Sequence, residues 1–227
     1  MKKLTIYSEI AYLFGIFLLA LGNSFSAFAD FGMSMVVAPA YVLHLALVKI
    51  LPWFSFGVAE YTVQALVILA LIVMTRRVKV RFFLSFGTTL IYGVFLDVVM
   101  VAVALLPSLF VLRVVAFVLG FLLSSFGVAI LFTTYFPPGL YEVLVQEIVG
   151  KWNLKLGVVK TVYDVCSLVV AVAMSLLIFG GLQGIGVGTV VCAFLNGTLI
   201  HLFGRLFSRL FAVKDALPWR GFFEGKQ

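Results

Sequence analysis

Long apolar runs recur from one end of the chain to the other. Each predicted run is about 20 residues long, the length that a helix needs to cross the hydrocarbon core of a bilayer. Two further apolar stretches, 33–51 and 137–150, are interrupted by proline or charged residues, so they predict half-helices rather than full spans. The six predicted spans are residues 7–28, 57–75, 83–105, 110–132, 157–178 and 187–209.

The positions of lysine and arginine set the expected topology, because short cytoplasmic loops are enriched in them. With the N-terminus inside, six spans place the basic segments 76–81, 151–155 and 205–226 in the cytoplasm. A seventh span at 33–51 would send the densest basic segment outside. Arg113 is the exception, near the outer end of the fourth span, where its long side chain can reach the headgroups. The sequence therefore predicts a multi-pass protein of a bacterial cytoplasmic membrane, with both termini in the cytoplasm.

The composition excludes a water-soluble fold. Of the 227 residues, 64% are hydrophobic and 11% are charged, about half the charged share of an average soluble domain. The net charge of +7 does not indicate a nucleic-acid partner, because the basic residues lie between apolar runs rather than on one polar face. The expected partner is the lipid bilayer. Cys166 and Cys192 fall inside predicted spans, where apolar packing is a commoner role than a disulfide.

The two halves of the sequence resemble each other. Gly15 to Gly22 reads GIFLLALG and Gly120 to Gly127 reads GFLLSSFG, at an offset of 105 positions. The glycines at both ends of each run, Gly15, Gly22, Gly120 and Gly127, are expected to let helices pack closely. Matches in the same order and at a nearly constant offset indicate a duplication. The further matches pair Tyr41 with Tyr141, 56–58 with 156–158, and Gly87-Thr88 with Gly188-Thr189.

Each copy of this predicted duplication contains three spans. An odd number forces the second copy to enter the membrane upside down, which is the inverted-repeat plan of many secondary transporters. The predicted fold class is an all-α integral membrane protein with six transmembrane helices, built as two inverted three-helix repeats. Each repeat has a half-helix or re-entrant segment after its first helix. The first repeat covers residues 1–108, the second covers 109–211, and residues 212–227 form a cytoplasmic tail.

Short glycine-led motifs give the chain a likeness to a known group. The segment 29–34 reads ADFGMS, and Gly-Thr pairs occur at 87–88 and 188–189. These motifs resemble those of the uncharacterised bacterial membrane proteins of the YczE/YyaS/YitT group, and the likeness covers most of the chain. The second copy departs from the group's loop pattern with YFPPG at 135–139, so the two loops need not share a role. The resemblance implies a multi-pass cytoplasmic-membrane protein of no settled activity.

Ionisable groups at bilayer depth are costly unless paired or wet, so each one suggests a function. Lys160 and Asp164 are four residues apart and share one helix face, where they can bind each other or a solute. Their repeat mates are Glu60 and Gln64, so both halves place a polar pair on the equivalent helix. The alternative is that Glu60 pairs with Lys160 or another basic group as a structural contact between helices.

A second set of candidate residues lies in the third and sixth spans. Asp97, beside Tyr92, can take up a proton or a sodium ion as a coupling group. Asn196 falls at a matching depth in the sixth span. Possible further contributors are His44, Tyr141 and Tyr163, the tyrosines through contact with an aromatic solute. The two histidines of the chain are too far apart for one metal site, and the sequence predicts no metal, cofactor or catalytic residue.

Three classes of function compete on this evidence. A transporter, or the substrate-binding membrane subunit of one, explains the polar pairs inside the spans. The chain has no GxxxxGK[ST] loop, so the energy would come from a coupling ion or from a separate ATPase module. An intramembrane enzyme is disfavoured, because no HExxH motif is present and because Thr189, rather than an aspartate, follows Gly188 where the pattern begun by Tyr163-Asp164 would need one. The alternative is a non-transporting accessory or immunity membrane protein that acts through a protein partner.

Overall fold

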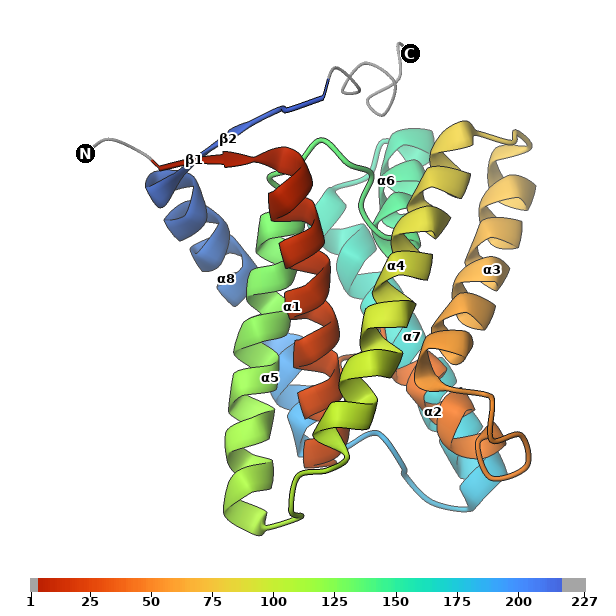
Figure 1. Ribbon diagram of the computed structural model, residues 1–227. Helices are drawn as coiled ribbons and strands as arrows, with labels where there is room; N and C mark the ends of the chain where they lie inside the picture. Colours follow the sequence, from red (N-terminus) through yellow and green to blue (C-terminus); the bar gives the residue numbers. More distant parts are fainter. Residues whose placement is uncertain (1–3, 218–227) are drawn as a thin grey trace.

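The computed structural model describes residues 4–217, in which six helices are long and apolar enough to cross a membrane (Figure 1). The predicted all-α membrane fold is confirmed, and each span ends within three residues of its predicted bounds. Residues 218–227, most of the predicted tail, lie outside the described part. The six long helices are α1 (Ser8–Ala29), α3 (Phe56–Thr75), α4 (Val80–Val103), α5 (Phe110–Leu131), α7 (Leu156–Phe179) and α8 (Val187–Leu210). The shorter elements are α2 (Ala38–Leu47), α6 (Leu140–Trp152), β1 (Leu4–Tyr7) and β2 (Phe211–Lys214).

Proline and backbone conformation explain why α2 and α6 are short. α1 ends at Ala29 and is followed by Asp30, whose φ of 56° lies in the left-handed region, and by Gly32 with a φ of 109°. Pro39 then lies in the first turn of α2, where its missing N–H leaves no helical hydrogen bond unmade. α6 likewise begins at Leu140, with only Gly139 between it and Pro137 and Pro138. The prolines therefore start each half-helix after a break, as the sequence predicts.

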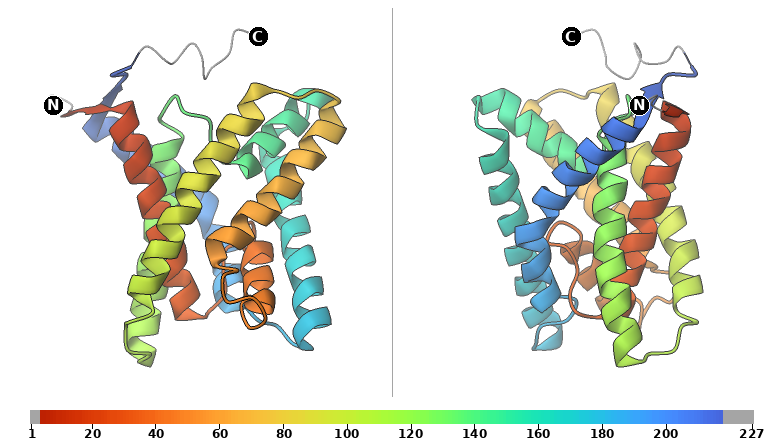
Figure 2. Two further views of the ribbon diagram at one scale, coloured as in Figure 1. Left: turned by 45° about the vertical axis from the view of Figure 1, so that its right-hand side comes forward. Right: turned by 90° about the vertical axis from the view of Figure 1, so that its left-hand side faces the viewer.

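The order long, short, long, long occurs twice along the chain, in α1–α4 and again in α5–α8. α1 starts at the end of the molecule where β1 and β2 lie, which we call the terminal end, and α5 starts at the opposite end (Figure 1). Figure 2 shows α2 near the opposite end and α6 at the terminal end. This arrangement is the one that an inverted duplication predicts, while the duplication itself stays a prediction.

Glycines allow α1 and α5 to pack with their backbones in contact. A Cβ atom on Gly22 would lie 2.5 Å from the carbonyl oxygen of Gly120, and one on Gly127 would lie 2.6 Å from that of Gly15. Such distances leave no room for any side chain. The predicted close packing at these four glycines is confirmed, and the crossing fixes the centre of the bundle.

The two halves differ in how tightly their last two helices pack. α3 packs on α4, where a Cβ atom on Gly57 would lie 2.6 Å from the carbonyl oxygen of Gly93. α7 instead packs on α2 and α6, whereas α8 packs on α5. Cβ atoms added at Gly157 of α7 or Gly197 of α8 would meet nothing within 4 Å. The second half is therefore open where the first half is closed.

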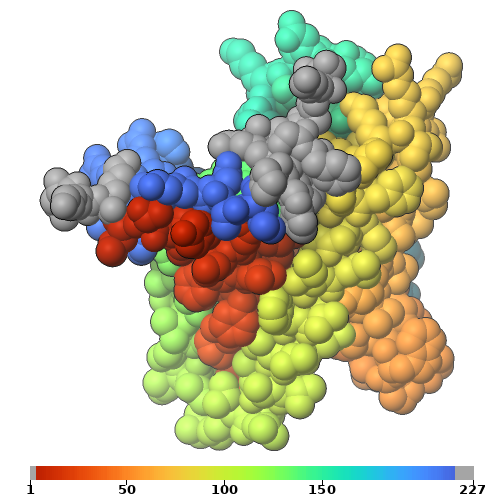
Figure 3. Space-filling model, turned by 45° about the horizontal axis from the view of Figure 1, so that its top comes forward, coloured from red at the N-terminus to blue at the C-terminus, as the bar shows by residue number. Residues whose placement is uncertain are grey.

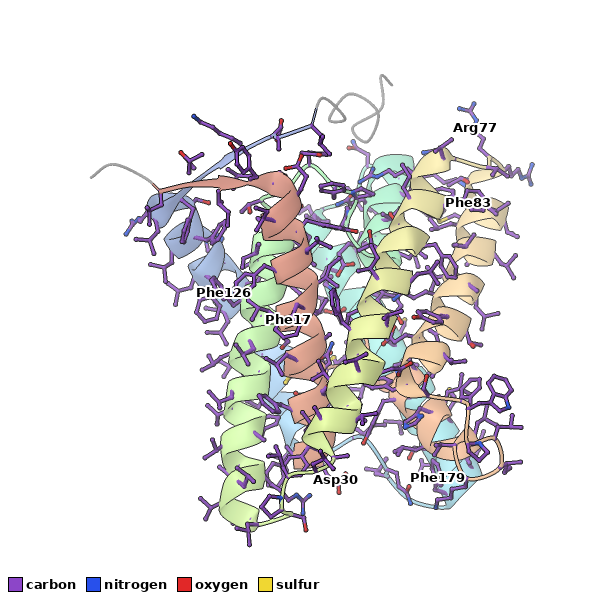
Figure 4. The ribbon with its side chains drawn as sticks, viewed as in Figure 1. Phe17, Asp30, Arg77, Phe83, Phe126 and Phe179 are labelled. Carbon is purple, nitrogen blue, oxygen red and sulfur yellow. The ribbon has the colours of Figure 1, made fainter. Side chains whose placement is uncertain are left out.

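Basic side chains gather at the terminal end. Figure 4 shows Arg77 there, in the turn between α3 and α4, and Asp30 at the opposite end. Lys79 forms an ion pair of 2.7 Å with Glu147 of α6. β1 and β2 pair in parallel, so the two described ends of the chain lie together. Figure 3 views this end, with α6 and the α3–α4 turn on one side and α1 with β2 on the other.

Arg113 lies at the opposite end and holds the end of α1 in place. Its Nε donates a hydrogen bond of 2.8 Å to the carbonyl oxygen of Ala29, and its guanidinium lies 3.3 Å from the Asp30 carboxylate. The guanidinium also stacks over the Phe31 ring at 5.3 Å. Its charge is therefore paired at the end of the bundle, where the sequence predicts contact with the headgroups.

Candidate solute-binding cavity

A cavity of about 150 Å³ lies between the two halves of the molecule. Every long helix contributes to its wall, together with the start of α6 and the residues that precede α2. The chain therefore brings segments from its whole length to one central point. The polar and charged lining residues are Asn23, Ser26, Ser34, Glu60, Gln64, Thr88, Thr89, Tyr92, Ser124, Tyr141, Glu142, Lys160 and Asn196.

Glu60 is the most deeply placed charged group in this wall. Its side chain is fully buried, and Oε2 accepts hydrogen bonds from the Tyr141 hydroxyl at 2.9 Å and from Gln64 Nε2 at 3.1 Å. The Gln64 carbonyl in turn accepts a hydrogen bond from the Thr89 hydroxyl. The other carboxylate oxygen of Glu60, Oε1, is buried without a hydrogen-bond partner. Buried polar atoms are rarely left unpaired, because each one costs about 1–3 kcal/mol.

Two asparagines add amide groups to the cavity. Asn23 Nδ2 donates a hydrogen bond of 2.7 Å to the Tyr92 hydroxyl, and both side chains are buried. The Ser125 hydroxyl donates one of 3.0 Å to Asn196 Oδ1. The polar groups of α1, α4, α5 and α8 are thus held in fixed orientations around the cavity.

Lys160 is the one cationic side chain in the described wall of the cavity. Its Nζ lies 3.0 Å from Asp164 Oδ1 on the same helix, as the four-residue spacing predicts. The alternative contact between Glu60 and Lys160 is not made, because the hydrogen bonds of Glu60 come from Tyr141 and Gln64. Glu142 brings a second carboxylate to the wall, from the first turn of α6.

Asp97 lies outside the cavity, at the N-terminus of α3. Oδ2 accepts a hydrogen bond of 2.6 Å from the Ser55 hydroxyl, and Oδ1 accepts one of 2.8 Å from the Gly57 N–H. The first N–H groups of a helix have no partner within the helix, and a carboxylate there is favoured by the helix dipole. Asp97 therefore joins α4 to the start of α3, and each of its two carboxylate oxygens accepts a hydrogen bond.

Substitutions at Asp97 test whether this role is structural. Asp97→Ala removes both acceptors, so we expect it to lower the free energy of unfolding by about 1–3 kcal/mol, whereas Asp97→Asn keeps one acceptor and lowers it less. Thermal unfolding of the purified variants in detergent measures the difference. Unchanged melting combined with lost solute uptake would instead give Asp97 the predicted coupling role.

The remaining predicted residues divide between the cavity and its surroundings. His44 Nδ1 lies 2.9 Å from the carbonyl oxygen of Phe54, in the segment between α2 and α3. The Tyr163 ring lies behind the wall, with its centre 6.2 Å from that of Tyr141. Asp164 also stands behind the wall and reaches the cavity through Lys160. The predicted residues that line the cavity are Glu60, Gln64, Tyr92, Tyr141, Lys160 and Asn196.

Several lining residues were not among the predicted site residues. Thr88 accepts a hydrogen bond of 2.7 Å from the Tyr12 hydroxyl and donates one of 3.2 Å to the carbonyl oxygen of Pro137. The sequence signal for Thr88 was the Gly-Thr pair at 87–88, which recurs at 188–189. Asn23 follows Gly22 directly, so the α1–α5 glycine contact was the signal that it lies at the centre of the bundle.

Six helices long and apolar enough to cross a membrane, around a central cavity with buried polar groups in a largely apolar wall, define a multi-pass integral membrane protein. Among residues 4–217, no group of three or more His, Cys, Asp or Glu side chains is placed to hold a metal ion. A family model described as a family of unknown function, DUF6198, matches residues 6–205, so the chain belongs to that family. Comparisons with curated proteins and with solved structures give no match.

Proposed function

We propose that the protein transports a small solute across the membrane, or captures it as the membrane subunit of a transporter. The observation that carries this proposal is the unpartnered Oε1 of Glu60 in the wall of the central cavity. An ionisable residue at bilayer depth suggests a functional site, because its burial is costly without a partner. A solute or a proton supplies that partner.

The unequal packing of the two halves supports a transport cycle. α3 is closed against α4, whereas α7 and α8 stand apart. In inverted-repeat transporters, one repeat or bundle moves against the other around a fixed central site and so opens that site to each side in turn. The reciprocal contacts of Gly15 with Gly127 and of Gly22 with Gly120 agree with a two-fold relation between α1 and α5. The proposed cycle keeps this glycine crossing fixed and moves the last two helices of each half.

The proposal places the terminal end in the cytoplasm of a bacterial cell, because the basic segments gather there. Energy would come from a coupling ion or from a separate ATPase module. We also propose that the protein is related to the YczE/YyaS/YitT group and that it acts without enzymatic activity.

Filling the cavity tests this function directly. Cys192 lines the cavity from α8, whereas Cys166 is exposed on α7, so the same substitution can be made inside and outside the site. We expect Cys192→Phe to abolish solute binding and Cys166→Phe to leave it unchanged. The measurement is a thermal-shift screen in detergent against amino acids, vitamins, nucleobases and polyamines, because a ligand of the folded state raises its melting temperature. Binding that survives Cys192→Phe would place the solute elsewhere.

The second candidate function is an accessory or immunity protein that acts on another membrane protein. The observation that favours it is the exposure of α7 and α8, in which only 17% of each spanning window is buried, against 61% in α1. Such faces can contact lipid or another protein. A stable partner recovered with the protein from its own membrane, together with no hit in the solute screen, would favour this function over transport.

A further inference from the structure

We propose that the cavity binds a small organic cation with an apolar body. This inference deepens the proposed function and rests on it, because it names the class of solute. Two features of the wall carry it: an excess of negative charge at one side of the cavity and apolar side chains at the other. Both features follow from the described contacts.

With its carboxyl groups ionised, the site has a negative charge balance. Glu60 and Glu142 are the described carboxylates in the wall, and Lys160 is the described cation. Asp164 already neutralises Lys160, at 3.0 Å. The carboxylate of Glu60 retains one oxygen without a hydrogen-bond partner, so a cationic donor at this point would complete its hydrogen bonds. Charge-assisted hydrogen bonds of this kind are the stronger class.

The helix N-termini beside the cavity do not reverse this balance. The start of α6 would favour an anion, but Glu142 folds back over it, with Oε2 3.0 Å from where a Cβ atom on Gly139 would be. At the start of α2, the N–H groups of Val37 and Ala38 both donate to the carbonyl oxygen of Ser34. Neither helix start therefore offers free N–H groups to an anion, whereas Glu60 offers a free oxygen to a cation.

Apolar side chains form much of the wall contributed by α1 and α5, beside the polar Asn23, Ser26 and Ser124. Ile16 and Leu19 come from α1, and Phe121 and Val128 come from α5. A charged solute without an apolar part would leave these apolar side chains in contact with water, so the favourable burial of apolar surface would be lost. The volume of about 150 Å³ matches that of cavities that accommodate benzene. The solute part that enters this space is therefore of the size of one ring or a short alkyl chain.

Three probes of one shape test the charge. Benzylamine is protonated at neutral pH, benzyl alcohol is neutral and benzoate is an anion, and all three carry the same ring. We expect benzylamine to bind the purified wild-type protein about 10- to 100-fold more tightly than the other two, as a charge-assisted hydrogen bond predicts. Isothermal titration calorimetry in detergent measures the three affinities. Equal or tighter binding of benzyl alcohol or benzoate would overturn the inference.

A matched pair of variants tests whether the carboxylate of Glu60 binds the cation. Glu60→Gln removes the carboxylate and keeps a side chain that can accept the Tyr141 hydrogen bond. Glu147→Gln makes the same change outside the cavity, at the ion pair with Lys79. We expect Glu60→Gln to weaken benzylamine binding at least about tenfold and Glu147→Gln to leave it unchanged. Unchanged affinity in a folded Glu60→Gln protein would overturn the inference, and the wild-type probe series decides it even if this variant does not fold.

The two proposals fail in different ways. If none of the three probes binds while the broader solute screen gives a ligand that Cys192→Phe abolishes, only the cation inference is overturned. If neither the probes nor the screen gives a ligand, the solute-binding function fails with it. Binding of benzoate in the cavity would keep the function and reverse the class of solute.

Discussion

Gly22→Leu is expected to prevent folding, because the α1–α5 crossing has no room for a side chain. A Cβ atom at this position would lie 2.5 Å from the Gly120 carbonyl oxygen and 2.5 Å from the Ser124 backbone nitrogen. Both are backbone atoms, so the helices themselves must separate, and the free energy of unfolding should fall by about 3 kcal/mol or more. Size-exclusion chromatography and thermal unfolding in detergent measure the loss of folded protein.

The control is Gly197→Leu, because a Cβ atom there meets nothing within 4 Å. It lies in α8, so it matches the change in hydrophobicity inside a membrane-crossing helix. We expect this variant to give normal yield and melting. If both variants fold equally well, α1 and α5 do not need their close approach, and the proposed fixed crossing at the centre of the transport cycle is wrong.

The spans and half-helices could be predicted because each is written locally in the sequence. Hydrophobic length fixes a membrane helix without reference to its neighbours. Pro39, Pro137 and Pro138 mark the breaks that precede α2 and α6 in the same local way. The close glycines of α1 and α5 also stand in the sequence, since a seven-residue spacing keeps both on one helix face. These features therefore needed no knowledge of how the helices pack.

The candidate site could be predicted only in part, because a polar residue in a span does not show which way it faces. Glu60 and Asp97 are both acidic residues within predicted spans. The structure turns Glu60 into the cavity and turns Asp97 onto the start of α3. The choice depends on the rotation of each helix, which the α1–α5 and α3–α4 contacts set. The neighbouring Gly22 marks Asn23 as central, but the hydrogen bond of Asn23 to Tyr92 depends on the same rotations.

Long-range pairing is the other feature that local patterns do not contain. β1 and β2 join the two described ends of the chain, with Leu4 opposite Phe211. Two strands of four residues carry too little pattern to be distinguished from the helices that they adjoin. The separation of α7 from α8 is equally non-local, since both are long and apolar enough to cross a membrane, as α3 and α4 are.

The Lys160–Asp164 pair gives the prediction that joins the cavity to the proposed solute. Asp164→Asn leaves the Lys160 ammonium without its partner, free to pair with the carboxylates of the wall. The chain's own cation would then compete with the solute, so we expect benzylamine affinity and uptake at low concentration to fall roughly tenfold or more. The double variant Lys160→Gln/Asp164→Asn removes both charges and should recover affinity to within a few-fold of wild type.

This rescue separates an electrostatic role from a structural one, because a merely structural Asp164 would not be replaced by a second substitution. Titration calorimetry measures affinity, and uptake into reconstituted liposomes measures transport, with thermal unfolding as the check on folding. Lys79→Gln, which breaks the ion pair with Glu147 outside the cavity, is the matched control and should change neither quantity. If the double variant stays as weak as Asp164→Asn, Asp164 contacts the solute itself. The paired charges would then form part of the binding site rather than hold its balance.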